Sequence, residues 1–208
     1  MNGTHNDRHS TPSDIAFTPS VKAVQSRKGS RNAFIRMEND GGWETIITSR
    51  VADFIAVQTS VFLATASAAG QPYIQHRGGP PGFLHVLDDK TIAFADFRGN
   101  RQFITTGNLA ENPRAHLFLM DYASRQRIKL WGTAEIVEDD AALVARLMPA
   151  DYKAKSDQAI VFHVEAWDAN CSQHIPQRFD ASDVERVLNQ RDVIIATLEA
   201  EIERLKSS

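Results

Sequence analysis

The sequence predicts a mainly β protein with flanking helices, in which an antiparallel sheet forms a small barrel. Seven short segments rich in β-branched and aromatic residues alternate with turn residues, and few segments have a helical period. The chain has 208 residues, of which 42% are hydrophobic and 24% are charged, so it is long enough to bury one core. These features favour a barrel over a doubly wound parallel sheet.

Residues 1–45 are expected to form an N-terminal extension that is partly disordered and contains a short helix. Residues 1–13 are polar and have little apolar surface to bury, so we expect them to stay unordered. A helix is predicted from Pro19 to Gln25. A polar, glycine-containing connection should then lead to Trp43.

The main domain is expected to span residues 46–180 and to begin with a helix over Thr45–Gln58. Its apolar residues fall near a helical period, and Thr45 is available as the N-cap. Four strands should follow, at 61–67, 72–77, 83–87 and 91–97. Because their connections are short, we expect these strands to pair as hairpins.

A helix over 100–110 is predicted next, and it should end before Pro113, since a proline disfavours helical geometry in the residue before it. Strands are then predicted at 115–122, 127–137 and 159–168, with a helix between the last two.

Residues 181–208 are expected to form a separate C-terminal element, an amphipathic helix over 181–206. Leu188, Ile195, Leu198, Ile202 and Leu205 follow steps of seven, three, four and three residues, and Arg191 takes the remaining position of this seam. Because the repeat is shorter than four heptads, we favour a helix that packs on the barrel, alone or across a dimer, over a partner-binding coiled coil.

Composition excludes several classes of protein. The net charge is −3 and no basic tract is present, so nucleic acid is not expected as a ligand. No apolar run suits a membrane span or a secretion signal, and the single cysteine cannot form an intrachain disulfide, so we expect a cytoplasmic protein. The histidines lack metal-ligand spacing, so no metal is expected.

The segment "QHRGGPPGF" is the first candidate binding site. Gln75 and Arg77 share one face of a predicted strand, and Gly78 and Gly79 let backbone amides approach a ligand. An arginine beside such amides suits a phosphate or an oxygen-rich ring edge. The alternative is a wide hairpin loop that carries a surface arginine.

Two further stretches collect polar groups. In "FRGNRQF", the predicted helix starts at Asn100, Arg101 and Gln102, and this helix start could bind a phosphate. Asp96, from the preceding strand, is also expected to bind the cofactor. In "RQRIKLWG", Arg127 and Lys129 share a cationic and aromatic face of a strand. A solvated sheet face would have the same pattern.

The loop "NCSQHIPQRF" follows the last predicted strand and contains Cys171, Gln173, His174 and Arg178. Such a loop could close over a ligand and contact the substrate. Equally, Cys171 could be a small buried residue and His174 a hydrogen-bonded spacer.

The stretch from "FLATAS" to "GTAEIVED", with "HRGGPPGF", "FRGN" and "GNLAENPR" inside it, resembles flavin-nucleotide-binding proteins related to pyridoxamine 5'-phosphate oxidase. The resemblance covers about residues 46–180. It implies a six-stranded antiparallel split β-barrel that forms a homodimer, with FMN bound between the subunits.

The resemblance also implies roles for individual residues. Arg77 matches the arginine that opens the flavin-contacting strand, Asn100 and Arg101 stand where the family binds the phosphate, and Gln126 corresponds to a flavin-contacting glutamine. The segment that holds pyridoxal phosphate in the true oxidase has no match, so a vitamin B6 substrate is not expected.

We therefore expect an FMN-dependent oxidoreductase whose catalytic residues and substrate the sequence does not identify. The alternatives are a flavin-binding or redox-sensing module without turnover, and a split barrel that binds a deazaflavin or haem.

Overall fold

The computed structural model describes residues 10–170 and 172–207, and the chain divides into two compact units. Among these residues, the larger unit comprises 10–120 and 127–170 and the smaller one comprises 121–126 and 172–207. No helix in the described part of the chain is long and apolar enough to cross a membrane.

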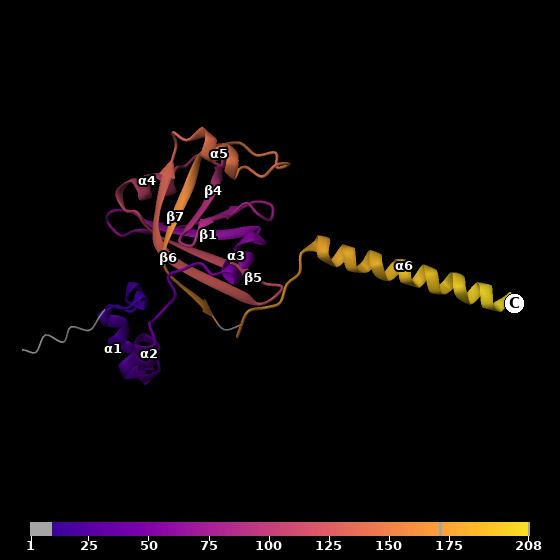
Figure 1. Cartoon of the computed structure of the whole chain (residues 1–208), viewed down its shortest axis with the longest axis horizontal. Coiled ribbons are helices and arrows are strands. Elements are labelled where there is room, and N and C mark those ends of the chain that lie inside the picture. The colour runs from indigo at the N-terminus through magenta and orange to yellow at the C-terminus, as the bar shows by residue number, and fades with distance from the viewer. Residues whose placement is uncertain (1–9, 171, 208) are drawn as a thin grey trace, which may run out of the picture. The chain divides into compact units, whose positions relative to one another are not determined.

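Within the described residues, seven strands form one sheet, and helices flank it (Figure 1). The strands are β1 (Ser60–Ala66), β2 (Pro72–Gly78), β3 (His85–Asp88), β4 (Thr91–Phe97), β5 (Arg114–Asp121), β6 (Gln126–Val137) and β7 (Ser156–Asn170). The helices are the 3-10 helix η1 (Pro12–Ile15) and the α-helices α1 (Pro19–Lys28), α2 (Arg31–Asn39), α3 (Ser49–Ala56), α4 (Ile104–Glu111), α5 (Ala141–Leu147) and α6 (Ala181–Lys206).

The order of strands is β2-β1-β5-β6-β7-β4-β3. The pairs β1–β2, β1–β5, β3–β4, β4–β7 and β6–β7 are antiparallel. The predicted fold class, mainly β with flanking helices around an antiparallel split barrel, is therefore confirmed. The sheet has seven strands, as the hydrophobic pattern predicts, where the family resemblance implies six.

The expected hairpin between the second and third strands is wrong. Strands β2 and β3 lie at opposite edges of the sheet, so residues 79–84 connect the two edges. Within this connection, Phe83 N donates to Pro80 O at 3.0 Å and Gly82 has a φ of +85°, as in a type II turn. The prolines and Gly82 thus shape a turn inside a crossing segment.

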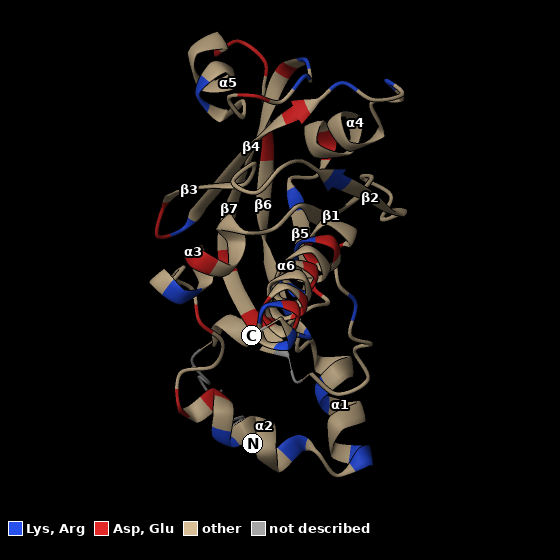
Figure 2. Cartoon of the chain, turned by 90° about the vertical axis from the view of Figure 1, so that its right-hand side faces the viewer, with Lys and Arg blue, Asp and Glu red and all other residues tan. Residues whose placement is uncertain are grey.

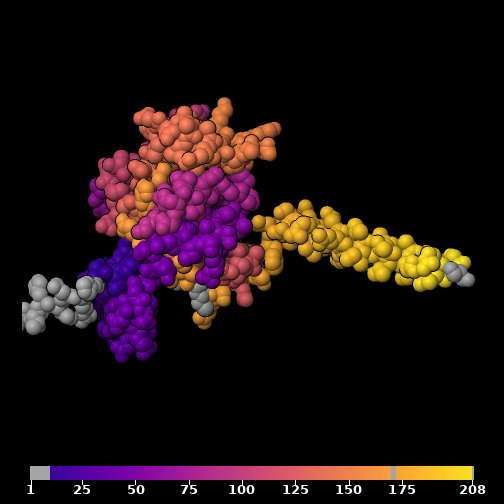
Figure 3. Space-filling view, viewed as in Figure 1, coloured from indigo at the N-terminus to yellow at the C-terminus, as the bar shows by residue number. Residues whose placement is uncertain are grey.

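Both faces of β4 are covered, which explains its continuous apolar run. Ile92 and Phe94 belong to the main core, together with Val51 and Ile55 of α3. The alternate residues Ala93 and Ala95 belong to a second cluster with Val144 and Leu147 of α5. Side chains fill the spaces that the ribbons leave between strands of this unit (Figure 3).

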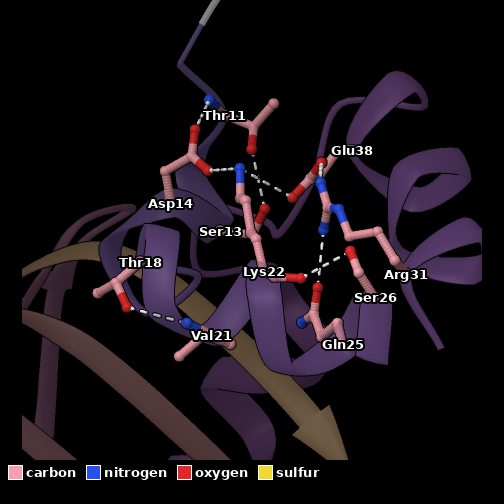
Figure 4. A network of polar contacts seen from close by, with 10 residues as sticks. All are labelled: Thr11, Ser13, Asp14, Thr18, Val21, Lys22, Gln25, Ser26, Arg31 and Glu38. Atoms are coloured by element: carbon pink, nitrogen blue, oxygen red, sulfur yellow. Dashed lines mark hydrogen bonds and ion pairs between the residues drawn. The ribbon is translucent and has the colours of Figure 1, made fainter. Parts of the chain in front are cut away.

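The polar connection expected after the first helix is instead a second helix, α2. Arg31 of α2 is buried, donates to Gln25 Oε1 at 2.8 Å, and forms an ion pair with Glu38 (Figure 4). Lys22 binds the same Glu38 at 3.2 Å and also Asp14 of η1. These charged residues look solvent-exposed in a sequence, but here they bind one another.

Two helix starts differ from prediction. Helix α3 begins at Ser49, because Thr48 rather than Thr45 is the N-cap and accepts a hydrogen bond from Val51 N. Helix α4 begins at Ile104 rather than near Asn100, since Arg101 and Phe103 have positive φ angles of 59° and 54°. Residues 98–103 therefore form a loop.

Candidate functional site

A cavity in the larger unit gathers polar residues from five segments of the chain. It has an empty volume of about 560 Å³, which includes its solvent-open mouth. Its lining comprises Tyr73, Gln75 and Arg77 of β2, Asp96 and Phe97 of β4, the loop from Arg98 to Phe103, Ile104, Thr105 and Thr106 of α4, and Asp157 and Gln158 of β7.

Six of the eleven residues predicted to bind a cofactor line this cavity: Gln75, Arg77, Asp96, Asn100, Arg101 and Gln102. The alternation of β2 explains the first part of this set, because Tyr73, Gln75 and Arg77 are partly buried whereas Ile74 and His76 are exposed. Strands β1, β5, β6 and β7 lie between β2 and β4 in the sheet order, so the sequence alone does not bring Arg77 and Asp96 together.

Arg77 and Asp96 form a partly buried ion pair. Arg77 Nη1 lies 2.6 Å from Asp96 Oδ1, and the two side chains are 16% and 10% exposed. Arg77 Nε is buried and makes no hydrogen bond to any described residue. This N–H group therefore lacks the acceptor that a buried donor normally has.

The cavity lining carries an excess of positive charge. Three arginines, Arg77, Arg98 and Arg101, face two aspartates, Asp96 and Asp157, which leaves a net charge of +1 (3 − 2). Arg98 Nε donates to Asp157 Oδ2 at 2.6 Å, and Arg98 Nη2 donates to Asp157 Oδ1. These two hydrogen bonds lower the pKa of Asp157 and keep it ionised. Arg101 is exposed and lies with its guanidinium 5.6 Å from the ring centroid of Phe103.

A network of hydrogen bonds joins the strands to the first turn of α4, and three of its members, Thr105, Thr106 and Gln158, were not predicted from the sequence. Thr105 Oγ1 donates to Gln75 Oε1 at 3.1 Å and accepts from Arg77 at 3.4 Å. Gln158 Nε2 donates to Asp96 Oδ2 at 2.6 Å and to Thr106 Oγ1 at 3.3 Å. Gln158 directly precedes the apolar residues of β7 in the sequence. A polar residue at the end of such a run was the signal that could have indicated a buried hydrogen-bonding group.

Gly78 and Gly79 are not among the residues that line the cavity. Gly79 N donates to Thr59 O at 3.1 Å, and a Cβ atom at Gly79 would lie 2.7 Å from the ring of Phe83. Close packing against the buried Phe83 thus explains why a glycine stands at position 79. Its amide is engaged within the chain.

The predicted residues of β6 lie on another part of the protein. Gln126 is exposed, and Arg127 and Lys129 are partly buried. Lys129 Nζ lies 3.0 Å from Asp168 Oδ2 and 5.2 Å from the ring centroid of Trp131.

Trp131 belongs to an aromatic cluster that extends to the N-terminal segment. Its ring stacks on Trp43 at a centroid distance of 4.5 Å, and Trp43 in turn contacts Phe17 at 5.1 Å. The rings of His116 and Trp131 meet edge to face, with their centroids 4.8 Å apart. Burial, with the nearby charge of Lys129, lowers the pKa of His116 to about 4, so this histidine is neutral at pH 7.

The residues predicted to contact a substrate fall in the smaller unit, except Cys171, which lies outside the described residues. Gln173, His174 and Arg178 are all exposed, and His174 has a positive φ of 64°. The guanidinium of Arg178 lies 4.9 Å from the ring centroid of Tyr122 within the same unit.

The donors in the cavity suit an oxyanion. Guanidinium groups at Arg77 and Arg101, amides at Asn100 and Gln102, and hydroxyls at Thr105 and Thr106 surround the same space. The unpaired Nε of Arg77 supplies a donor that a phosphate oxygen would satisfy. Asp96 limits this attraction, because it neutralises part of the charge of Arg77.

Comparison with known proteins identifies one family. The sequence model of the family described as pyridoxamine 5'-phosphate oxidase matches residues 47–171. No relative was found among curated proteins.

Two solved structures are similar to this chain. HupZ of Group A Streptococcus is 22% identical, with a TM-score of 0.50, and the match covers 64% of this chain and 99% of that chain. An FMN-binding protein from Syntrophomonas wolfei is 15% identical, with a TM-score of 0.45, over 70% of this chain and 97% of that chain.

Proposed function

Because the chain belongs to the pyridoxamine 5'-phosphate oxidase family, we propose that it binds FMN and acts as a flavin-dependent oxidoreductase. The domain that carries this function is proposed to span residues 46–180. The observation that supports the proposal is the cavity between β2, β4, the 98–103 loop and α4, with its excess of positive charge.

We place the phosphate group of FMN in this cavity. Arg101 is its principal cationic partner, since Arg77 and Arg98 each already bind an aspartate. Arg77 adds a directed donor through its free Nε, and Thr105 holds the guanidinium and Gln75 in place. Bound FMN would supply hydride or electron transfer, while the protein supplies position and electrostatics.

A homodimer is part of this proposal. On the face of the sheet opposite to the buried residues of β1, Phe62 pairs with Phe118 of β5 and both are partly buried, whereas Ile74 of β2 is 61% exposed. A partly exposed apolar strip on a sheet is typical of a surface that binds another protein chain. Gln126, Arg127 and Lys129 are proposed to reach the flavin through such an assembly.

The first experiment is the absorbance spectrum of the purified protein, with mass spectrometry of whatever heat denaturation releases. Flavin bands and released FMN are expected. A colourless protein that also fails to bind added FMN would contradict the proposal. Anaerobic reduction of the bound flavin by NADH or NADPH then tests for turnover.

Variants test the placement of the phosphate. We expect Arg101→Ala to weaken FMN binding about tenfold to a hundredfold, because a charge-assisted hydrogen bond contributes roughly 1.5–3 kcal/mol. Arg77→Ala should also weaken it. Arg114→Ala, which changes an exposed arginine outside the cavity, is the control and should bind like the parent. Equal affinity for all four proteins would remove the phosphate from this cavity.

A further inference from the structure

Helix α6 exposes an apolar seam along its whole length. None of its described residues is buried, and the exposed fractions of Leu188, Ile195, Leu198 and Ile202 are 41%, 43%, 57% and 49%. Leu205 is 61% exposed. A 26-residue helix with such a seam gains stability when a surface covers its apolar side chains.

The seam follows a heptad repeat. Leu188, Ile195 and Ile202 are spaced by seven residues and take the a positions. The d positions are Val184, Arg191, Leu198 and Leu205. We propose that α6 binds the α6 of a second copy of this chain as a parallel, two-stranded coiled coil.

The choice of residues favours two strands over three or four. Among parallel coiled coils, Ile at the a positions 195 and 202 with Leu at the d positions 198 and 205 is the combination typical of dimers. The apolar repeat has the same register from end to end, so two identical helices in register bury all of their seam residues together.

The charges of α6 agree with a second copy as the partner. In a parallel pair, a g residue faces the e residue of the following heptad in the other helix, which brings Glu201 opposite Lys206 of the partner helix. A d residue packs beside the partner's e residue, so Arg191 lies beside Asp192 of the partner helix. Within one chain, Arg191 Nη2 already donates to Asp192 Oδ1 at 2.8 Å. Figure 2 shows that α6 carries both acidic and basic residues.

Arg191 gives the interface specificity at a cost in stability. Two guanidinium groups meet near the middle of the seam, and only the register that brings each beside an Asp192 compensates them. The proposal goes beyond flavin binding, because it requires no ligand and no residue of the cavity.

Cysteine cross-linking in the full-length protein tests both the partner and the direction. In a Cys171→Ser background, Leu205→Cys places a thiol at a d position close to the C-terminal end of the helix. A parallel pair brings the two thiols together, whereas an antiparallel pair would put them at opposite ends. Mild oxidation should therefore convert most of the chain to a covalent dimer.

Ala200→Cys is the matched control, since Ala200 takes an f position on the outer face of the coiled coil. It should give little covalent dimer at the same protein concentration. No dimer from Leu205→Cys would overturn the proposal, as would equal yields from the two positions.

A second pair of variants separates seam contact from contact through the barrel. Adding Ile195→Asp, at an a position, to the Leu205→Cys chain should abolish the cross-link, because it places a carboxylate in the seam. Adding Val193→Asp, at an f position where the side chain is 67% exposed, should leave it unchanged. Cross-linking that survives Ile195→Asp would refute the coiled coil. FMN binding is measured alongside and should be the same in both chains.

Discussion

Gly132 is the residue whose identity the backbone most strictly requires. It lies where the register of β6 and β7 shifts, and a Cβ atom there would be 1.9 Å from His163 O. The partner atom is backbone and cannot move aside without disrupting the strand pair. We expect Gly132→Ala to lower the free energy of unfolding by about 2 kcal/mol or more, as measured by urea denaturation.

Gly107 provides the matched control for this substitution. It lies inside α4, and a Cβ atom there would meet no heavy atom within 4 Å. Gly107→Ala should raise the free energy of unfolding by roughly 0.5–1 kcal/mol, since alanine restricts the unfolded chain and favours helix. If Gly132→Ala did not lower the free energy of unfolding either, the close approach of β7 at the bulge beside Gly132 would be wrong.

His116 makes stability depend on pH. Its pKa is about 4 in the folded protein and about 6.5 when unfolded, so the unfolded chain binds more protons between these values. The contribution of neutral His116 to the free energy of unfolding should therefore be fully present above about pH 6.5, and it should be lost as the pH drops toward 4. In His116→Gln, the denaturation midpoint measured between pH 7 and pH 4.5 should fall less steeply with decreasing pH than it does in the parent protein.

His163→Asn is the control for this pH dependence. The His163 side chain is 48% exposed, and its substitution should leave the slope of the parent unchanged. An identical slope in His116→Gln and the parent would show that another group causes the loss of stability.

At the scale of elements, buried charges hold α1 and α2 together. Arg31→Ala removes the hydrogen bond to Gln25 and the ion pair with Glu38, and leaves Glu38 with Lys22 alone. Breaking a buried ion pair costs about 3 kcal/mol or more, so local opening should become roughly a hundredfold more frequent. Limited trypsin digestion should then cleave within residues 19–39 much faster than in the parent.

Arg36→Ala is the control for the digestion, because Arg36 is exposed and its substitution also removes one tryptic site. It should be cleaved at the rate of the parent. Equal rates for Arg31→Ala and Arg36→Ala would mean that the Arg31 network does not hold this segment.

The sequence predicted well those strands in which the order of apolar and polar residues matches the order of buried and exposed positions. The alternation of β2 and β6 and the unbroken apolar run of β4 are visible in the sequence. Helix α2 was missed, because its polar residues Arg31 and Glu38 bind each other instead of water. The loop before α4 was missed because the left-handed geometry of Arg101 and Phe103 has no signal in either residue type.

At the scale of the whole molecule, bound FMN should stabilise the fold. A ligand that binds only the folded protein at a hundred times its Kd adds about 2.7 kcal/mol to the free energy of unfolding. A rise in Tm with FMN concentration is therefore expected in thermal melts. Riboflavin, which lacks the phosphate, should raise Tm less at the same concentration.

The Arg101→Ala chain distinguishes the two parts of the flavin in this measurement. If Arg101 binds the phosphate, the difference between FMN and riboflavin should shrink in that chain. An undiminished difference would place the phosphate elsewhere.

The sequence by itself determined the strands, the long C-terminal helix and the residue types of the candidate site, since these depend on period and chemistry within one segment. Only the tertiary structure decided that β2 and β3 lie at opposite edges, and that Arg77 faces Asp96 and Gln158. Strand order depends on which buried faces fit together across the sheet. A pattern within one segment cannot specify that fit.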